Sequence, residues 1–179
     1  MSALAVPRQW RAGALLRDLV ARPSGAIGLA LVTFHVLLAL LSPWLVPHDY
    51  KAMDATLTLA EPSAAHWLGT DHLGRDVLSR LIHGGANSLY AALLAVAVAL
   101  LIGIPLGLIA GFVGGWTDVA ISRLIDTFLS FPAIILAVAV TGAMGIGLTN
   151  AMFSVGLVFA PQIARLIRAR TLVVRQELY

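Results

Sequence analysis

The residues best suited to ligand binding or catalysis gather in one stretch of the chain, from His66 to Gly85. It holds the run Gly69-Thr70-Asp71 and, shortly after it, the run Gly74-Arg75-Asp76. Histidine and aspartate side chains bind metals and transfer protons, so His66, His72 and Asp71 could form a metal site. Their spacing matches no zinc-binding pattern, however, and we favour helix capping and surface packing for them. The sequence therefore predicts no metal ligands and no cofactor.

The same stretch predicts a short amphipathic helix at about residues 72–83, lying at the outer surface of a membrane. Apolar residues recur in it every four positions: Leu73, Val77 and Leu81. Thr70 or Asp71 can cap the start of this helix. Asp76 precedes Arg80 by four residues, which is the favoured order for a helical ion pair.

No catalytic constellation accompanies this stretch. The chain contains no Cys, and its single lysine, Lys51, does not follow a phosphate-binding glycine loop. The zinc-protease motif H-E-x-x-H and the nucleophile motif G-x-S-x-G are also absent from the sequence. We therefore expect no catalytic residues, no enzyme activity and no ATP hydrolysis by this chain alone.

The composition indicates the environment in which these residues are positioned. Hydrophobic residues make up 59% of the 179 residues and charged residues 12%, against about 45–50% and 25% in soluble proteins. This excludes an ordinary soluble domain and a disordered chain. The net charge is +3, but charged residues are too few and too scattered to form a surface that binds nucleic acid. We therefore expect membrane lipid as a partner and no nucleic acid.

Three long segments lack Asp, Glu, Lys and Arg: residues 23–48, 81–117 and 127–164. A membrane-spanning helix needs roughly 20 apolar residues. The last segment can hold two short spans, divided by a Gly-rich cluster that ends at Asn150. The sequence thus predicts an all-α polytopic membrane protein with four spans, at about residues 25–46, 88–113, 131–144 with flanks, and 151–167. The remaining parts are a tail at 1–24, a loop at 47–87 and a loop at 114–126, with 88–179 as one transmembrane domain.

Arginines flank both ends of the predicted bundle: Arg8, Arg11, Arg17 and Arg22 before it, and Arg165, Arg168, Arg170 and Arg175 after it. Only Asp18 and Glu177 oppose them. Arginine-rich flanks stay on the cytoplasmic side. Both ends are therefore predicted to be cytoplasmic, which requires an even number of spans and places the loop at 47–87 outside.

Small residues recur every four positions in the second predicted span: Ala91, Ala95, Ala99, Gly103, Gly107, Gly111 and Gly115. This pattern is typical of helices that pack closely in membranes. We take Gly103, Gly107 and Gly111 as packing positions, in preference to faces that slide. The polar residues Asn150 and Gln162 are candidates for lining a path, although packing hydrogen bonds are the favoured interpretation.

Several of these segments resemble the C-type permease subunits of ABC importers for dipeptides, oligopeptides and nickel. The resemblance lies in His66-Trp67-Leu68-Gly69-Thr70-Asp71, Gly74-Arg75-Asp76-Val77-Leu78-Ser79-Arg80, Gly114-Gly115-Trp116-Thr117-Asp118, Arg123-Leu124-Ile125-Asp126, Phe131-Pro132 and Gly147-Leu148-Thr149-Asn150. Its most specific part is the family motif Gly69, Thr70, Asp71, Gly74, Arg75 and Asp76.

The resemblance implies a permease subunit of the bacterial inner membrane that forms part of the translocation path for di- or oligopeptides. It implies three kinds of partner: a second permease subunit, two ATP-binding subunits and an external substrate-binding protein. The residues that it implies as facing the ATP-binding subunits are Arg165, Arg168, Arg170, Arg175 and Glu177.

The family normally has six spans, with a Glu-Ala-Ala coupling loop after the fourth. This chain stops where that loop should begin, so we expect a truncated form that does not couple ATP hydrolysis to transport by itself. Two alternatives stay open. One is a permease of the same family for nickel or another small solute, and the other is a membrane scaffold that does not transport.

Overall fold

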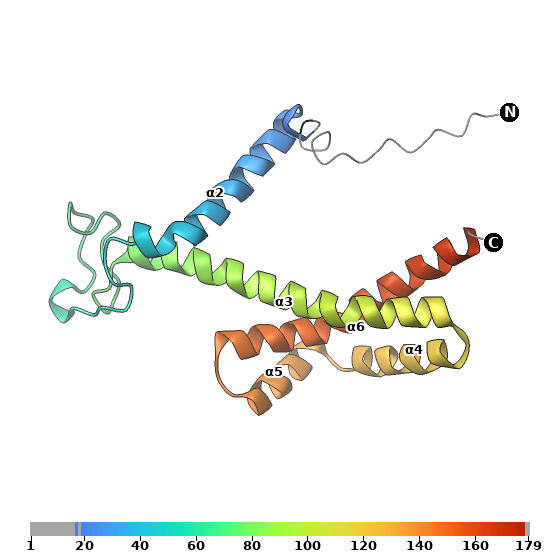
Figure 1. Cartoon of the computed structure of the whole chain (residues 1–179). Helices are drawn as coiled ribbons and strands as arrows, with labels where there is room; N and C mark the ends of the chain where they lie inside the picture. The colour runs from blue at the N-terminus through green and yellow to red at the C-terminus, as the bar shows by residue number, and fades with distance from the viewer. Residues whose placement is uncertain (1–16, 18, 178–179) are drawn as a thin grey trace. The chain divides into compact units, whose positions relative to one another are not determined.

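The computed structural model describes residue 17 and residues 19–177, and these form helices joined by loops (Figure 1). The elements are α2 (Pro23–Leu45), the short 3-10 helix η1 (Ala55–Leu57), α3 (Val77–Val113), α4 (Gly115–Ser130), α5 (Ala133–Met144) and α6 (Leu148–Glu177). Among the described residues there is no strand, only an isolated bridge between Thr70 and Asp76. The predicted all-α membrane fold is confirmed. Arg8, Arg11, Asp18 and the side chain of Glu177 lie outside what the structure describes.

Contacts within the chain divide it into two compact units, with the boundary between Asn87 and Ser88. The first unit contains α2, the polar loop after it and the beginning of α3. The second contains the rest of α3 together with α4, α5 and α6.

Three helices are long and apolar enough to cross a membrane, namely α2, α3 and α6, and the bent pair α4–α5 can supply a fourth crossing. The two helices of this pair meet at 93°. The span expected at 131–144 with flanks corresponds to α5 alone only in part, since α5 has 12 residues and covers about 18 Å of a hydrocarbon core about 30 Å thick. Pro132 causes the break, because proline restricts the preceding Phe131 to the extended conformation that the structure shows.

The expected inner loop at 114–126 is also wrong, because α4 occupies most of it. Gly114 separates the two helices: its left-handed backbone, with a φ of 72°, ends α3 and allows α4 to begin at the next residue. Charged residues such as Asp118, Arg123 and Asp126 indicate a loop between apolar spans, but here they belong to α4, an amphipathic helix.

The separate amphipathic helix expected at about residues 72–83 does not exist. Instead, α3 begins at Val77 and continues without interruption for 37 residues, about 56 Å at 1.5 Å per residue. Gly84 and Gly85 lower the local helix propensity, but single glycines are tolerated inside a helix. The helix therefore extends well beyond the roughly 30 Å that a membrane core requires.

The basic segment after the fourth predicted span is likewise helical. The span expected at 151–167 lies within α6, which continues through the arginines to Glu177 over 30 residues. The first predicted span, 25–46, agrees with α2 to within two residues at each end.

Large apolar side chains remain exposed on several helices, as expected for surfaces that face lipid or other subunits. On α2 the only buried residue is Ser42. Phe112 is 74% exposed and Ile134 79% exposed. The buried positions of the second unit are instead mostly small, including Ala99, Ala110, Ala160 and Ala164.

Three glycines of α3, namely Gly103, Gly107 and Gly111, lie where its backbone closely approaches α6. A Cβ atom added to Gly103 would lie 2.7 Å from the carbonyl oxygen of Ala160, and one added to Gly107 would lie 2.5 Å from that of Ala164. At Gly111 it would meet the Thr171 side chain at 2.6 Å. Gly156 of α6 reciprocates, since its Cβ would lie 2.6 Å from the carbonyl oxygen of Ala95. We call these four glycines the α3–α6 seam.

The seam leads to a prediction with a matched control in the same helix. Gly107→Ala should destabilise the protein, by about 1–3 kcal/mol for an overpacked contact, because the new methyl group meets a backbone carbonyl that cannot rotate away. Gly85→Ala has open space around the new atom, so it should be neutral or stabilising by about 0.5–1 kcal/mol. Thermal unfolding of the purified variants in detergent measures both. A Gly107→Ala protein as stable as Gly85→Ala would show that the helices do not pack this way.

Candidate functional site

The loop between α2 and α3 is organised around the carboxylate of Asp71. Its Oδ1 accepts hydrogen bonds from the backbone N–H of Leu73 at 2.8 Å and of Arg75 at 3.0 Å. Its Oδ2 accepts from the Arg75 guanidinium at 2.8 Å and from Arg80 Nη1 at 2.8 Å. One side chain therefore closes the turn before α3 and holds two cationic groups against it.

Two glycines of the family motif occupy positions that exclude a side chain. Gly69 and Gly74 both have a φ of 72°, a left-handed conformation that glycine adopts without strain. A Cβ at Gly69 would lie 2.5 Å from the carbonyl oxygen of Ala60, and at Gly74 it would overlap the backbone of Asp54. Both conformation and close approach thus require glycine at these two sites.

Thr70 fastens the loop to its preceding segment. Its side chain is buried, its hydroxyl donates to the carbonyl oxygen of Leu57, and it accepts from the backbone N–H of Ala60 at 2.8 Å. The Thr70 N–H donates to the Ala60 carbonyl oxygen at 3.1 Å. Thr70 is therefore a structural residue of the loop rather than the cap of a helix.

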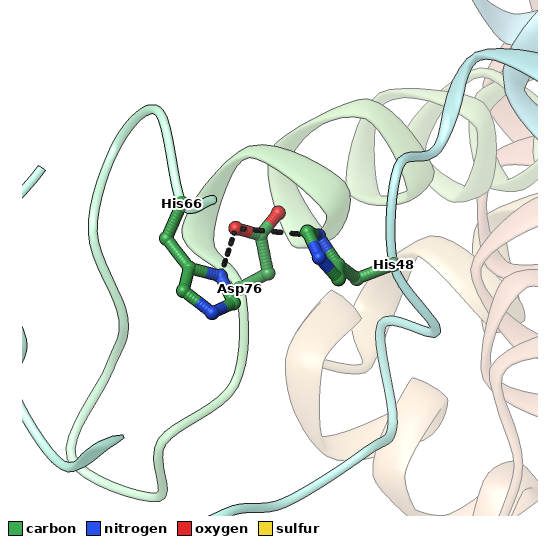
Figure 2. A group of neighbouring side chains, drawn as sticks. All are labelled: His48, His66 and Asp76. Atoms are coloured by element: carbon green, nitrogen blue, oxygen red, sulfur yellow. Dashed lines mark hydrogen bonds and ion pairs between the residues drawn. The ribbon is translucent and has the colours of Figure 1, made fainter. Parts of the chain in front are cut away.

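Asp76 caps α3 and also faces two histidines (Figure 2). Its Oδ2 accepts from the backbone N–H of Ser79 at 2.7 Å, the usual geometry of a helix cap. Its Oδ1 lies 3.0 Å from Nδ1 of His66 and 3.9 Å from Nδ1 of His48. The His48 backbone N–H donates to the buried Ser79 hydroxyl at 3.1 Å, which places His48 next to the start of α3.

Two expectations about these carboxylates are corrected. Neither Thr70 nor Asp71 caps the helix, since α3 starts later and Asp76 precedes it. The ion pair expected between Asp76 and Arg80 does not form, because Arg80 turns to Asp71. A spacing of four residues favours an ion pair only when both residues lie within one helix, and Asp76 lies just before the start of α3.

The surroundings of both carboxylates favour their charged forms. Desolvation acts to raise the pKa of Asp71, but backbone hydrogen bonds from Arg75 and Leu73 and the Arg75 guanidinium outweigh it and lower the pKa to about 2. Burial acts in the same way on Asp76, and hydrogen bonds from Ser79 and His66 lower its pKa below the usual 3.8. Both carboxylates therefore stabilise the folded loop above about pH 3.8, and the contribution of Asp71 is lost as the pH falls through about 2.

A pocket of about 460 Å³ lies beside the Asp71 turn. Its lining is cationic and aromatic: Tyr50, Lys51, Met53, Arg75, Arg80, His83, Gly84 and Asn87. Tyr50 stacks on His83 with ring centroids 3.6 Å apart. Asp71 pairs with both Arg75 and Arg80, so its one negative charge offsets part of the positive charge that these two arginines and Lys51 bring to the pocket.

The arginines predicted to face a partner subunit fall into two groups. Arg168 donates through its Nη2 to Asp118 of α4 at 2.7 Å, and Arg165 pairs with Asp126 of α4 at 2.7 Å. Arg170 and Arg175 are exposed. Asp118 and Asp126 were not predicted as partners of these arginines; the one signal for them in the sequence is that they are the only acidic residues between Asp76 and Glu177.

The two path candidates have different surroundings. Asn150 donates its side-chain N–H groups to the carbonyl oxygens of Met144 at 2.9 Å and Gly145 at 3.1 Å, so it closes the turn between α5 and α6. Gln162 is exposed on α6. The structure does not bring these two residues together.

In a comparison with known protein families, two families match separate parts of this chain. Residues 9–62 match the N-terminal transmembrane domain of oligopeptide transport permease C. Residues 103–179 match the binding-protein-dependent transport system inner membrane component. The two matches follow one another in the order of the chain.

Individual relatives agree with these families. A probable D,D-dipeptide transport system permease protein of Escherichia coli K12 is 42% identical over 83% of this chain and 50% of its own length. A nickel transport system permease protein of the same strain is 38% identical over 89% of this chain and 57% of its own length. A glutathione transport system permease protein of Pectobacterium atrosepticum is 41% identical over 95% of this chain and 55% of its own length. The chain spans about half the length of these relatives.

The role of Asp71 can be tested by limited proteolysis with trypsin, which cuts after Arg and Lys. In Asp71→Asn the two guanidinium groups lose their anionic partner, so cleavage after Arg75 and Arg80 should become several-fold faster because the loop opens more often. Cleavage after the exposed Lys51 should not change. Glu61→Gln, which removes an exposed carboxylate from the same loop, is the control. Equal cleavage patterns in both variants would contradict the organising role of Asp71.

Proposed function

Since the chain belongs to the family of binding-protein-dependent inner membrane permeases, in its oligopeptide permease C branch, we propose that it forms part of the translocation path of an ABC importer for di- or oligopeptides. The observation that carries this proposal is the presence of both family segments, in order, on one helical membrane chain. Two of the three relatives described above are named for a dipeptide and for glutathione, and both are small peptides. Nickel, named for the third, is the second candidate substrate.

The proposed partners are a second permease subunit, two ATP-binding subunits and an external substrate-binding protein. The exposed apolar faces of α2 and α5 support contact with lipid and with another permease subunit. The exposed Arg170 and Arg175 at the end of α6, with Glu177, are the proposed contacts to an ATP-binding subunit. Arg165 pairs with Asp126 and Arg168 with Asp118 of α4, which supports a different role for these two arginines, namely to link α6 to α4.

In the proposed arrangement the protein lies in the inner membrane with both ends cytoplasmic and the loop between α2 and α3 outside. The support is the arginine content of the segments at the two ends, and the low lysine and arginine content of residues 47–87. With α4 and α5 forming one broken crossing, four crossings return the chain to the side from which it started.

This orientation predicts the labelling of single cysteines, which is free of background because the chain contains no Cys. A membrane-impermeant maleimide should label Glu61→Cys in intact spheroplasts. It should label Gln176→Cys only after the membrane is permeabilised. Both positions are exposed, so failure to react reports the side of the membrane and not burial. Labelling of Gln176→Cys from outside would refute the four-crossing arrangement.

Transport is tested in the native cells, with variants placed at the chromosomal gene. Gly107→Leu forces a bulky side chain into the α3–α6 seam, so it should reduce uptake of a radiolabelled dipeptide at least about tenfold by breaking the packing. Gly85→Ala should leave uptake unchanged.

Nickel uptake measured in the same cells separates the candidates. Loss of nickel uptake with dipeptide uptake intact would replace the peptide proposal with the nickel one. If neither uptake changes in Gly107→Leu, the chain carries neither solute, and both transport proposals fail.

A further inference from the structure

Three side chains from separate segments converge on one point outside the helical spans (Figure 2). His48 follows α2, His66 lies in the loop, and Asp76 immediately precedes α3. One potential ligand atom from each lies within 4.8 Å of the others. All three residues belong to the first compact unit.

We propose that His48, His66 and Asp76 bind a divalent transition-metal ion of the Zn²⁺ type, through one imidazole nitrogen of each histidine and one carboxylate oxygen. Two histidines and a carboxylate are a known ligand set for zinc. This proposal rests on the geometry of the loop and is independent of the proposed transport function.

The distances suit such an ion after small movements. Metal–ligand bonds of about 2.0–2.1 Å in a tetrahedral site separate neighbouring ligand atoms by about 3.3–3.4 Å. Asp76 Oδ1 lies 3.0 Å from His66 Nδ1 and 3.9 Å from His48 Nδ1. Shifts of about half an ångström or less therefore bring each nitrogen to the required distance from the carboxylate oxygen, and the two nitrogens, which lie within 4.8 Å of each other, must also approach by rotation of the exposed His48 ring.

A simple hydrogen-bonded pair accounts for only part of this cluster. His66 and Asp76 are joined by one hydrogen bond. His48, at 3.9 Å, is beyond hydrogen-bonding distance from the carboxylate, yet its ring lies with its centroid 4.7 Å from that of His66. A cation shared by the three side chains gives the second histidine a reason to lie there.

The surroundings already orient the ligands. The side chain of Asp76 is 2% exposed, and its Oδ2 is held by the Ser79 N–H, which leaves Oδ1 directed at the histidines. Such supporting hydrogen bonds fix a ligand and strengthen a metal site. His48 is 42% exposed, so an ion can enter from its side and keep a water molecule as fourth ligand.

The proton balance of binding is simple. In the metal-free protein, His66 Nδ1–H donates to Asp76. Coordination through Nδ1 requires this proton to move to Nε2, so a neutral imidazole changes tautomer and loses no proton. Imidazoles that are protonated cannot bind the ion, so affinity should fall as the pH is lowered.

A bound ion would join the segment after α2, the loop and the start of α3. Because the unfolded loop does not hold these ligands together, binding would stabilise the folded loop. The site would therefore hold the loop between α2 and α3 against the start of α3.

The test is titration of the purified full chain, in detergent and with a tag that contains no histidine. Zn²⁺ binding is measured by calorimetry, and Co²⁺ is used as a spectroscopic probe of tetrahedral coordination. We expect one ion per chain, visible Co²⁺ absorption bands, and a rise in the unfolding temperature with Zn²⁺. His48→Gln should weaken binding at least about tenfold, and His72→Gln, an exposed histidine of the same loop, should not.

His48→Gln is the main variant because the His48 side chain makes no hydrogen bond within the described part of the chain, so the loop should stay folded. Asp76→Asn is the second, since its remaining oxygen can still accept the Ser79 N–H while the charge is lost. Absence of saturable binding below millimolar Zn²⁺ in the unmodified chain would overturn the proposal. Equal loss of affinity in His48→Gln and His72→Gln would overturn it as well.

Discussion

The second unit depends on the close approach of two helix backbones. Lipid tails are as apolar as leucine side chains, so helices in a membrane gain little from burying apolar surface and instead require close packing. In this chain the seam glycines of α3 and Gly156 of α6 bring the carbonyl groups of each helix against the other. The helix α4 then lies against α6, where the pairs from Arg165 to Asp126 and from Arg168 to Asp118 fix it.

The loop between α2 and α3 depends on polar contacts, because its large apolar side chains, such as Met53, Leu59 and Trp67, stay exposed. Two carboxylates hold its backbone instead: Asp71 closes the turn and Asp76 caps the following helix. Gly69 and Gly74 provide the left-handed backbone that lets the segments approach each other. The family motif is thus explained position by position as a compact hydrogen-bonded turn.

Sequence patterns predicted the structural features that depend on residues close together in the chain. They did not predict the features that depend on contacts between residues far apart in the chain. The charge-free segments gave α2 almost to the residue, and the four-residue repeat located the glycines that meet α6. The start of α3 was misplaced because Asp76, and not Asp71, provides the cap. His48 could not be assigned to the cluster with His66, since no local spacing relates residues on opposite sides of a folded loop. The break between α4 and α5 does not follow from the charge-free pattern, because it depends on one local constraint, the effect of Pro132 on the backbone of Phe131.

The break between α4 and α5 determines which surroundings this part of the chain can tolerate. A helix that stops leaves its last carbonyl groups without the N–H partners that a further turn would supply. Here the Phe131 N–H donates to the carbonyl oxygen of Phe128, which satisfies one of these groups. Irregular backbone is tolerated at membrane depth only where protein or water surrounds it. Where the pair α4–α5 lies within a membrane, the bend at Phe131-Pro132 therefore needs protein or water around it, so this side of the pair is the one that cannot face lipid.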